Sequence, residues 1–272
     1  MMGGSIELLR SLERFSVAAL PARNSWELPG WLCLADDGAH VGRANSATPM
    51  PSEQSDEAPA TLSEVAASYR ERSLPPLIRW TPEAPSTLAS QLAENGWDSA
   101  GEVFVMVRPI PTRPNAGNED NAGAPLAPTE FEVELTAEAS PAWRETFGSS
   151  FSEEEAAARL RLALAAPQEK RFAEVRLDGV TAGVGLGISR DGKIGLFDIF
   201  VEQQFRRRGI AKRLITALES WAAETGADQA FLQVAANNDA AVALYRRLDF
   251  EVAYTYVYAG PELDSDEDDS AD

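Results

Sequence analysis

The hydrophobic pattern in the second half of the chain predicts strands that alternate with helices. The apolar run 194–201 has the length and content of a buried strand. From Ile210 to Trp221 apolar residues recur every three or four positions, which keeps them on one face of a helix, and Gly226 follows where such a helix would end. Asp178-Gly179 stands between two further apolar runs and indicates a hairpin.

The whole second half follows the same logic. We expect strand 131–135, helices near 141–147 and 153–165, strands 172–177, 180–188 and 194–201, a helix from residue 210, strand 230–235, helix 239–248 and strand 252–258. Strands mixed with helices of this length favour an α/β (α+β) fold class with a mixed central sheet flanked by helices.

The first half repeats much of this order. We expect helix 6–15, a hairpin of strands 31–35 and 40–44 around Asp36-Asp37-Gly38, a loop at 48–60, a helix from Thr61 to about residue 72, strand 77–80, helix 86–95 and strand 103–107. Thr61-Leu62-Ser63-Glu64 has the form of a capping box. Near the end of each half, a small or polar residue and an aromatic one (Gly96-Trp97, Asp249-Phe250) stand between the last helix and the last strand.

Composition divides the chain at residues 109–129, which include five prolines and several Gly and Asn. We predict a first domain at 1–108, this linker, a second domain at 130–260 and a disordered tail at 261–272. The tail is almost wholly Asp, Glu and Ser, a composition that cannot bury a core.

The composition also excludes several classes of protein. The 272 residues are 44% hydrophobic, as in globular proteins, and contain no apolar run of membrane-spanning length and no signal-like N-terminus. We therefore expect a cytoplasmic protein. The only cysteine, Cys33, lies in an apolar run and is expected to be a packed core residue, and the single His40 excludes a multi-histidine metal site, so no metal is expected.

Charge is distributed unevenly. The net charge of −19 argues against nucleic acid as a partner and favours a cationic substrate. The alternative is that the acidic residues only keep the protein soluble. Five basic residues nevertheless fall within eight consecutive positions: Arg206, Arg207, Arg208, Lys212 and Arg213. Because salt screens charge over about 8 Å, a polyanion would respond to this cluster more than to the distant net charge.

The basic cluster lies where strand 194–201 leads into the helix from Ile210. The first N–H groups of a helix lack intrahelical partners and carry the positive end of the dipole, which favours a phosphate by about 0.3–1 kcal/mol. Gly209 leaves no Cβ between the backbone and such an anion. The segment predicts a phosphate site, with a solvated strand-to-helix turn as the alternative.

Two motifs resemble those of the GNAT superfamily of acyl-CoA N-acyltransferases. Arg206-x-x-Gly209-x-Ala211 is similar to the (Arg/Gln)-x-x-Gly-x-(Gly/Ala) loop that holds the coenzyme A pyrophosphate. Asn238-x-x-Ala241-x-x-Leu244-Tyr245, followed by Leu248-Asp249-Phe250, is similar to the family's Asn-x-x-Ala-x-x-Leu-Tyr…Gly-Phe helix, with Asp249 in place of glycine. The resemblance implies a tandem GNAT fold with a degenerate N-terminal half, which lacks the Arg-x-x-Gly loop and is expected to bind no coenzyme A.

The resemblance also implies an activity. An acetyl group would pass directly from acetyl-CoA, the co-substrate, to a primary amine on a small molecule or a protein. The residues expected to bind the coenzyme are Phe200, Val201, Arg206, Arg207, Arg208, Gly209, Ile210, Ala211, Lys212 and Asn238. Tyr245 is the expected catalytic proton donor to the departing sulfur, and its alternative role is packing in the core. The alternative role of Asn238 is to cap the helix that it begins.

The sequence departs from the family at the general base. Family members often place a glutamate where this chain has Gln233, which cannot accept a proton, and Phe197 and Gly195 occupy the other usual strand positions. Asp198 is the candidate catalytic base, with a structural role as the alternative. Strict alternation puts it on the face opposite Phe197 unless a β-bulge intervenes.

Two other functions stay open at this stage. Gln233 is compatible with a CoA-binding regulatory pseudoenzyme. The tandem organisation is also similar to that of mycothiol synthases, which implies an amino-sugar conjugate as acceptor. No motif identifies the acceptor, the length of the acyl group or the oligomeric state.

Overall fold

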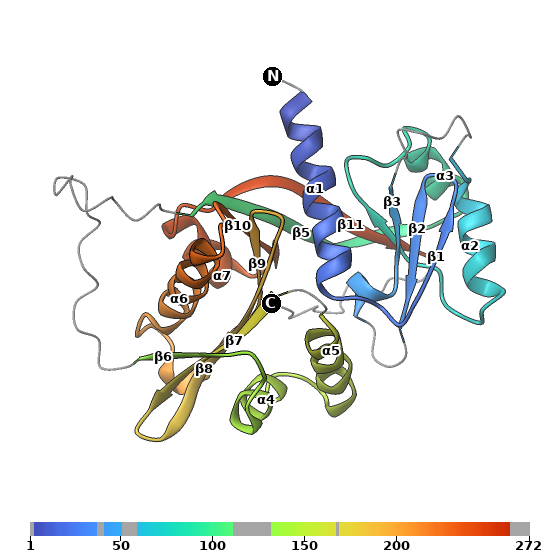
Figure 1. Ribbon diagram of the computed structural model, residues 1–272. Coiled ribbons are helices and arrows are strands. Elements are labelled where there is room, and N and C mark those ends of the chain that lie inside the picture. Colours follow the sequence, from blue (N-terminus) through green and yellow to red (C-terminus); the bar gives the residue numbers. More distant parts are fainter. Residues whose placement is uncertain (1–2, 37–40, 51–58, 111–131, 167–168, 262–272) are drawn as a thin grey trace.

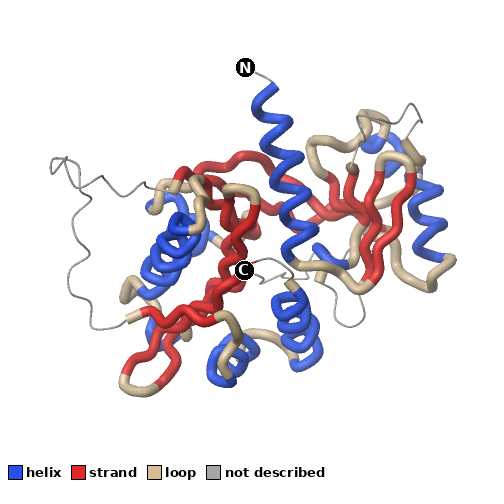
Figure 2. The backbone as a smooth tube through the Cα atoms, in the orientation of Figure 1, coloured by secondary structure: helices blue, strands red, loops and turns tan. Residues whose placement is uncertain are grey.

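The computed structural model describes residues 3–36, 41–50, 59–110, 132–166 and 169–261. These residues form an 11-stranded mixed sheet with helices on both faces (Figure 1). The strand order is β1-β2-β3-β4-β11-β5-β10-β9-β8-β7-β6, and Figure 2 shows the sheet running through both halves of the molecule. The predicted fold class is confirmed.

The second half has the predicted order of elements. They are β6 (Val133–Thr136), α4 (Pro141–Gly148), α5 (Glu153–Ala165), β7 (Glu169–Leu177), β8 (Val180–Arg190), β9 (Lys193–Val201), the short 3₁₀ helix η3 (Gln203–Phe205), α6 (Ile210–Glu224), β10 (Gln229–Ala235), α7 (Asp239–Arg247) and β11 (Glu251–Gly260). β9 and β10 are parallel and are joined by α6. Gly226 follows α6 with φ of +95°, as the glycine after a helix commonly does.

The first half contains α1 (Gly3–Ala19), β1 (Asn24–Leu28), β2 (Trp31–Ala35), the 3₁₀ helix η1 (Gly42–Ala44), β3 (Ala47–Pro49), α2 (Leu62–Arg70), β4 (Ile78–Trp80), α3 (Leu88–Glu94) and β5 (Asp98–Pro109). The capping box that opens α2 is confirmed, because Thr61 and Glu64 each accept a hydrogen bond from the backbone N–H of the other.

The hairpin predicted for the first half is wrong in its second strand. β2 pairs instead with β1, across the two-residue turn Pro29-Gly30, in which Gly30 has φ of +74°. This proline and glycine are a turn signal that the sequence analysis passed over. Residues 42–44 are helical rather than extended, and β3 (Ala47–Pro49) extends into the first two residues of the loop predicted at 48–60.

Some sequence predictions fall on parts of the chain that the structure does not describe. These are the turn around Asp37-Gly38, His40, most of the loop at 48–60, most of the linker at 109–129 and most of the tail at 261–272. The division into domains therefore stays a prediction.

The two halves exchange their last strands. β5, from the first half, lies between β10 and β11 and is antiparallel to both, with Met106 opposite Leu232 and Phe104 opposite Thr255. β11, from the second half, pairs on its other edge with β4, where Val257 is opposite Trp80. Figure 1 shows β5 and β11 running side by side where the halves meet. Each half thus completes the sheet of the other.

Helices cover both faces of the sheet. α6 and α7 pack on one face, where Leu196 of β9 and Leu214 of α6 belong to one buried cluster. α1, α4 and α5 pack on the other, where Phe197 and Trp143 belong to a second cluster. α2 and α3 cover β2 to β4, and burial of Cys33 there raises the pKa of its thiol to about 11, which confirms a packed and unreactive residue. Among the described residues, no helix combines the length and the apolar character needed to cross a bilayer.

Candidate active site

The parallel strands β9 and β10 separate at their carboxyl ends. Their ladder stops at the pair Leu196–Leu232, although both strands continue beyond it. On their outer edges, β9 stays paired with β8 and β10 with β5. A gap therefore opens between residues 197–201 and residues 233–235, where the inner edges are not paired with each other. The carboxyl end of such strands is where ligands bind in α/β sheets.

A β-bulge marks the start of the gap. The register between β8 and β9 shifts between Val184 and Leu186, so Asp198 and Ile199 both lie opposite Gly185. Asp198 has φ of +52°, a conformation that aspartate tolerates better than most residues, and is 8% exposed. The strict alternation that opposed a role for Asp198 is therefore interrupted at this residue.

The basic loop follows β9 at the same end of the sheet. Arg206 donates from Nε to the carbonyl oxygen of Val201 at 3.0 Å, which fixes the start of the loop to the end of the strand. Gly209 is the N-cap of α6 with φ of +82°, and a Cβ added to it would meet no atom within 4 Å. The first turn of α6 therefore opens onto free space. The side chains of Arg206, Arg207, Arg208 and Lys212 are exposed beside it.

The remaining predicted coenzyme residues differ in what they can offer. Phe200 and Val201 are half-buried at the end of β9, and Ala211 is half-buried in the first turn of α6. Ile210 is 1% exposed and packs tightly on Gly183. A Cβ added to Gly183 would lie 2.8 Å from the Cγ2 atom of Ile210. The side chain of Ile210 therefore belongs to the core, and only its backbone can reach a ligand.

Helix α7 begins and ends with defined caps. At its start Asn238 accepts a hydrogen bond from the backbone N–H of Ala241 at 3.1 Å, so the capping role is confirmed. At its end the N–H of Phe250 donates to the carbonyl of Tyr245 at 3.0 Å and that of Asp249 donates to Arg246 at 3.1 Å, which is a Schellman motif. Asp249 has φ of +63°, at the position where the GNAT motif has glycine.

This cap also holds the ring of Tyr245. The rings of Tyr245 and Phe250 meet edge to face with centroids 6.0 Å apart, the apolar contact that accompanies a Schellman motif. Tyr245 is 4% exposed and belongs to the cluster under α6 and α7. It therefore has a fixed orientation at the end of the helix that follows β10.

Gln233 lies on β10 just past the last residue paired with β9. Its Nε2 donates to the hydroxyl of Ser16 at 2.8 Å, and its Oε1 accepts from the hydroxyl of Tyr256 at 3.0 Å. Both ends of the amide are bonded to neutral groups, and Ser16 belongs to α1 of the first half. The first half thus reaches the position where family members place a glutamate.

A buried ion pair lies behind these groups. Glu13 and Arg79 are 1% and 3% exposed and form a salt bridge of 2.5 Å, and the hydroxyl of Tyr254 also donates to Glu13. The guanidinium of Arg79 lies 4.0 Å from the centroid of the Tyr256 ring. Both carboxylate oxygens of Glu13 are thus already engaged, one by the Arg79 guanidinium and the other by the Tyr254 hydroxyl.

A small cavity of about 40 Å³ adjoins the gap. It is lined by Val41, Gly42, Arg43, Val103, Arg159, Gln233, Val234, Ala235, Tyr256 and Tyr258. Burial raises the pKa of Tyr258 well above its usual value, so its phenol is neutral at physiological pH. The sequence analysis missed Arg43, Arg159 and both tyrosines, because they come from three separate elements and belong to no motif.

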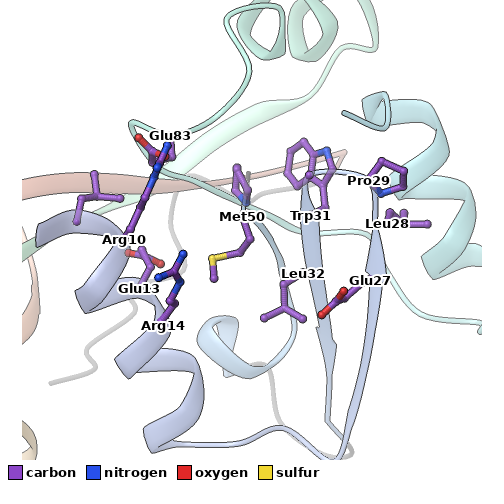
Figure 3. Close-up of a pocket in the computed structure, with 13 residues that line it drawn as sticks. Arg10, Glu13, Arg14, Glu27, Leu28, Pro29, Trp31, Leu32, Met50 and Glu83 are labelled. Carbon is purple, nitrogen blue, oxygen red and sulfur yellow. The ribbon is translucent and has the colours of Figure 1, made fainter. Parts of the chain in front are cut away.

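A larger cavity of about 570 Å³ lies in the first half (Figure 3). Figure 3 shows Arg10, Glu13 and Arg14 of α1 on one side and Glu27 and Trp31 of the β1–β2 hairpin on the other. None of the residues predicted for catalysis or coenzyme binding lines this cavity. The described residues also contain no group of three or more His, Cys, Asp or Glu that could hold a metal ion.

β9 and β10 thus part at their carboxyl ends, and a loop that contains arginine and glycine leads from β9 into α6. Together with the family match and the N-acetyltransferase relative that follow, this confirms the resemblance to the GNAT superfamily seen in the sequence. The chain belongs to the family described as "Probable histone acetyltransferase Rv0428c C-terminal", whose model matches residues 7–259. A Bacillus subtilis (strain 168) relative, "Uncharacterized N-acetyltransferase YobR", is 29% identical over 247 residues, which cover 89% of this chain and 94% of the relative.

Solved structures share the fold over nearly the whole chain. A GCN5-related N-acetyltransferase from Kribbella flavida has a TM-score of 0.64 at 19% identity and covers 95% of this chain and 97% of its own. A tandem GNAT protein from the clavulanic acid biosynthesis pathway has a TM-score of 0.62 at 13% identity, with 93% and 88% covered. The predicted tandem GNAT fold is confirmed.

Proposed function

We propose that this protein is an N-acetyltransferase that moves an acetyl group from acetyl-CoA to a primary amine while both are bound. One observation carries the proposal: the gap, the Gly209 loop and the Tyr245 helix all follow the carboxyl ends of β9 and β10. The family description and the name of the Bacillus subtilis relative support it.

The basic loop fits the pyrophosphate of coenzyme A. A diphosphate needs close approach to N–H groups, and Gly209 leaves that space open. The exposed arginines and Lys212 supply the positive charge, and Phe200 and Val201 line the gap with backbone groups that an extended ligand can bond. When bound, acetyl-CoA supplies the activated thioester carbon.

We assign Tyr245 as the proton donor for the departing sulfur. Its phenol is held by α7 and Phe250 and would stabilise a thiolate by donating its hydrogen bond. Asp198 is the candidate base, because it lies on the part of β9 that borders the gap and because Gln233 cannot take a proton. A base helps because an alkylammonium with a pKa of about 10.4 is neutral only about once in 2,500 molecules at pH 7.

Substitution of Gly209 tests coenzyme binding. Valine would be strained at φ of +82°, so we choose Gly209→Asn, since asparagine tolerates this conformation yet fills the space near the first turn. We expect CoA affinity, measured by calorimetric titration, to fall at least tenfold.

The matched control is Gly226→Asn at the other end of the same helix. Gly226 has φ of +95°, and an added Cβ likewise meets no atom within 4 Å. The two variants should therefore lose similar stability, but only Gly209→Asn should lose CoA. Equal CoA affinity in the two folded variants would contradict the assignment of the loop.

Asp198→Asn tests the base. Asparagine also tolerates a left-handed φ, so the bulge is kept while the proton acceptor is removed. We expect turnover at pH 7 to fall about tenfold or more and to recover towards pH 9, where more of the amine is neutral. A loss that is the same at both pH values would instead indicate a structural role.

The second candidate is a CoA-binding pseudoenzyme, favoured by the amide of Gln233 already bonded to Ser16 and Tyr256. It predicts that CoA binds but that no amine releases free thiol from acetyl-CoA. A screen of amines, peptides and amino sugars distinguishes the two functions, and selective turnover of an amino-sugar conjugate would favour a mycothiol-synthase-like activity.

A further inference from the structure

The small cavity beside the gap has a basic lining within a chain whose net charge is −19. Arg43 and Arg159 line it, and among the described residues that surround it none is acidic. A guanidinium is a planar fork whose N–H groups match the oxygens of a carboxylate or phosphate. The local charge therefore suits an anionic group better than the overall charge suggests.

The cavity lies where an acceptor has to meet the thioester. Its β10 lining is Gln233, Val234 and Ala235, the residues beyond the last pair with β9. Arg43 lies with its guanidinium carbon 5.9 Å from the centroid of the Phe197 ring, and Phe197 is the first β9 residue beyond that pair. Both walls of the gap thus border this cavity.

The position of Arg43 is set by contact between the two halves. The 3₁₀ helix η1 lies against β11 so closely that a Cβ on Gly42 would come within 2.7 Å of the Tyr258 ring. A side chain at residue 42 would have to displace the Tyr258 ring, and the next residue is Arg43. The first half thereby places a cation beside a gap formed by the second half.

Arg159 reaches the cavity from α5. It is 6% exposed, donates from Nε to Glu155 at 2.9 Å and lies with its guanidinium carbon 4.6 Å from the centroid of the Phe151 ring. These contacts fix its direction, and Glu155 offsets part of its charge. A substitution of Arg159 would also remove these contacts within the second half, so Arg43 is the residue to test.

We propose that Arg43 and Arg159 bind an anionic group of the acceptor, so that the preferred acceptor carries a carboxylate or phosphate together with its amine. This inference rests on the proposed transferase function and names the substrate class for the same site. An acceptor with both charges also agrees with an acidic protein, since its ammonium is attracted by the overall charge. The first half then selects the substrate as well as completing the sheet.

The test uses pairs of amines that differ only in the anion. The pairs are common L-amino acids with their carboxamides, phosphoethanolamine with ethanolamine, and lysine peptides that have Glu or Gln beside the lysine. Each amine is given to the full-length protein with acetyl-CoA, and the release of free thiol is measured. Within each pair that the enzyme acetylates, we expect the KM of the anionic amine to be at least tenfold lower than that of its neutral counterpart. Whether the carboxylate or the phosphate pairs respond identifies the anion.

Arg43→Gln should abolish this preference by raising the KM for the anionic acceptor about tenfold or more, with the KM for the neutral one and the affinity for CoA unchanged. Arg43→Lys should restore part of it, because the charge returns without the fork. The matched control is Arg72→Gln, an arginine of the same half whose guanidinium carbon lies 4.3 Å from the Trp26 ring, away from the cavity. It should leave the preference intact.

Three outcomes would overturn the inference. The first is that the wild type has equal KM values within every pair. The second is that the preference for the anionic amine survives Arg43→Gln. The third is that Arg43→Gln raises the KM of the anionic and the neutral amine by the same factor. If CoA binds and no amine in the panel releases thiol, the proposed transferase function fails and the acceptor site fails with it. Release of thiol with the neutral amines separates that case from a failure of the anion site alone, in which the amines are acetylated without a preference for the anionic ones.

Discussion

Tyr245→Phe is expected to lower kcat by about 10²–10⁴-fold and to leave the affinity for acetyl-CoA nearly unchanged. The ring stays in place against Phe250, and only the hydroxyl that would protonate the sulfur is lost. Steady-state release of free thiol gives kcat, and calorimetric titration with CoA gives the affinity.

The control for this variant is Tyr69→Phe. Tyr69 is also buried, and its hydroxyl donates to the carbonyl oxygen of Leu34 at 3.0 Å and accepts from the N–H of Leu34 at 3.2 Å. That variant should lose stability, by about 1–3 kcal/mol for two hydrogen bonds, with turnover unchanged. If Tyr245→Phe behaves in the same way, with turnover reduced less than about threefold, Tyr245 is a packing residue and the pseudoenzyme gains support.

Residues 130–272 on their own are expected not to form a stable CoA-binding protein. Without the first half, β10 and β11 lose the strand that joins them, because β5 pairs with both. Phe231 also loses the edge of Phe15, at 4.8 Å between centroids, and Gln233 loses Ser16. We expect no cooperative melting transition for this fragment and no CoA binding by calorimetry.

Co-expression of residues 1–129 with 130–272 is the control, because it breaks one peptide bond and keeps every strand. The pair should copurify, melt cooperatively and bind one CoA per complex, since the first half lacks the basic loop. A lone second half with the melting temperature and activity of the whole chain would contradict this, and two bound CoA would contradict the predicted inactivity of the first half.

Much of the fold was predictable because its signals are local. The capping box at Thr61, the glycine after α6 and the Asp178-Gly179 turn each fix one short segment from its own residues. The strand exchange was not predictable in this way. An apolar pattern shows that β5 is a strand but cannot show which strands it pairs with, and its partners lie more than a hundred residues away.

The residues of the candidate site also differ in whether local sequence predicts them. The positions of Gly209 and Asn238 at the starts of α6 and α7 could be predicted, because a helix N-cap depends on local sequence. The cavity that we propose for the acceptor could not be predicted, because Arg43, Arg159 and Tyr258 meet only after both halves have folded. The bulge at Asp198 could be named only as a possibility, since a register shift depends on the neighbouring strand.

The strand exchange also has a consequence for synthesis on the ribosome. β5 is complete at Pro109, whereas β11 ends at Gly260, about 150 residues later. At about 5–20 residues per second, the ribosome adds that stretch in roughly 8–30 s. β5 lacks both of its final neighbours until β10 is made at residue 235, and lacks β11 until the end of the stretch. The first half therefore cannot finish folding before the second is made. The centre of the sheet is assembled last, and the nascent chain carries β5 as an unpaired strand until β10 has been made.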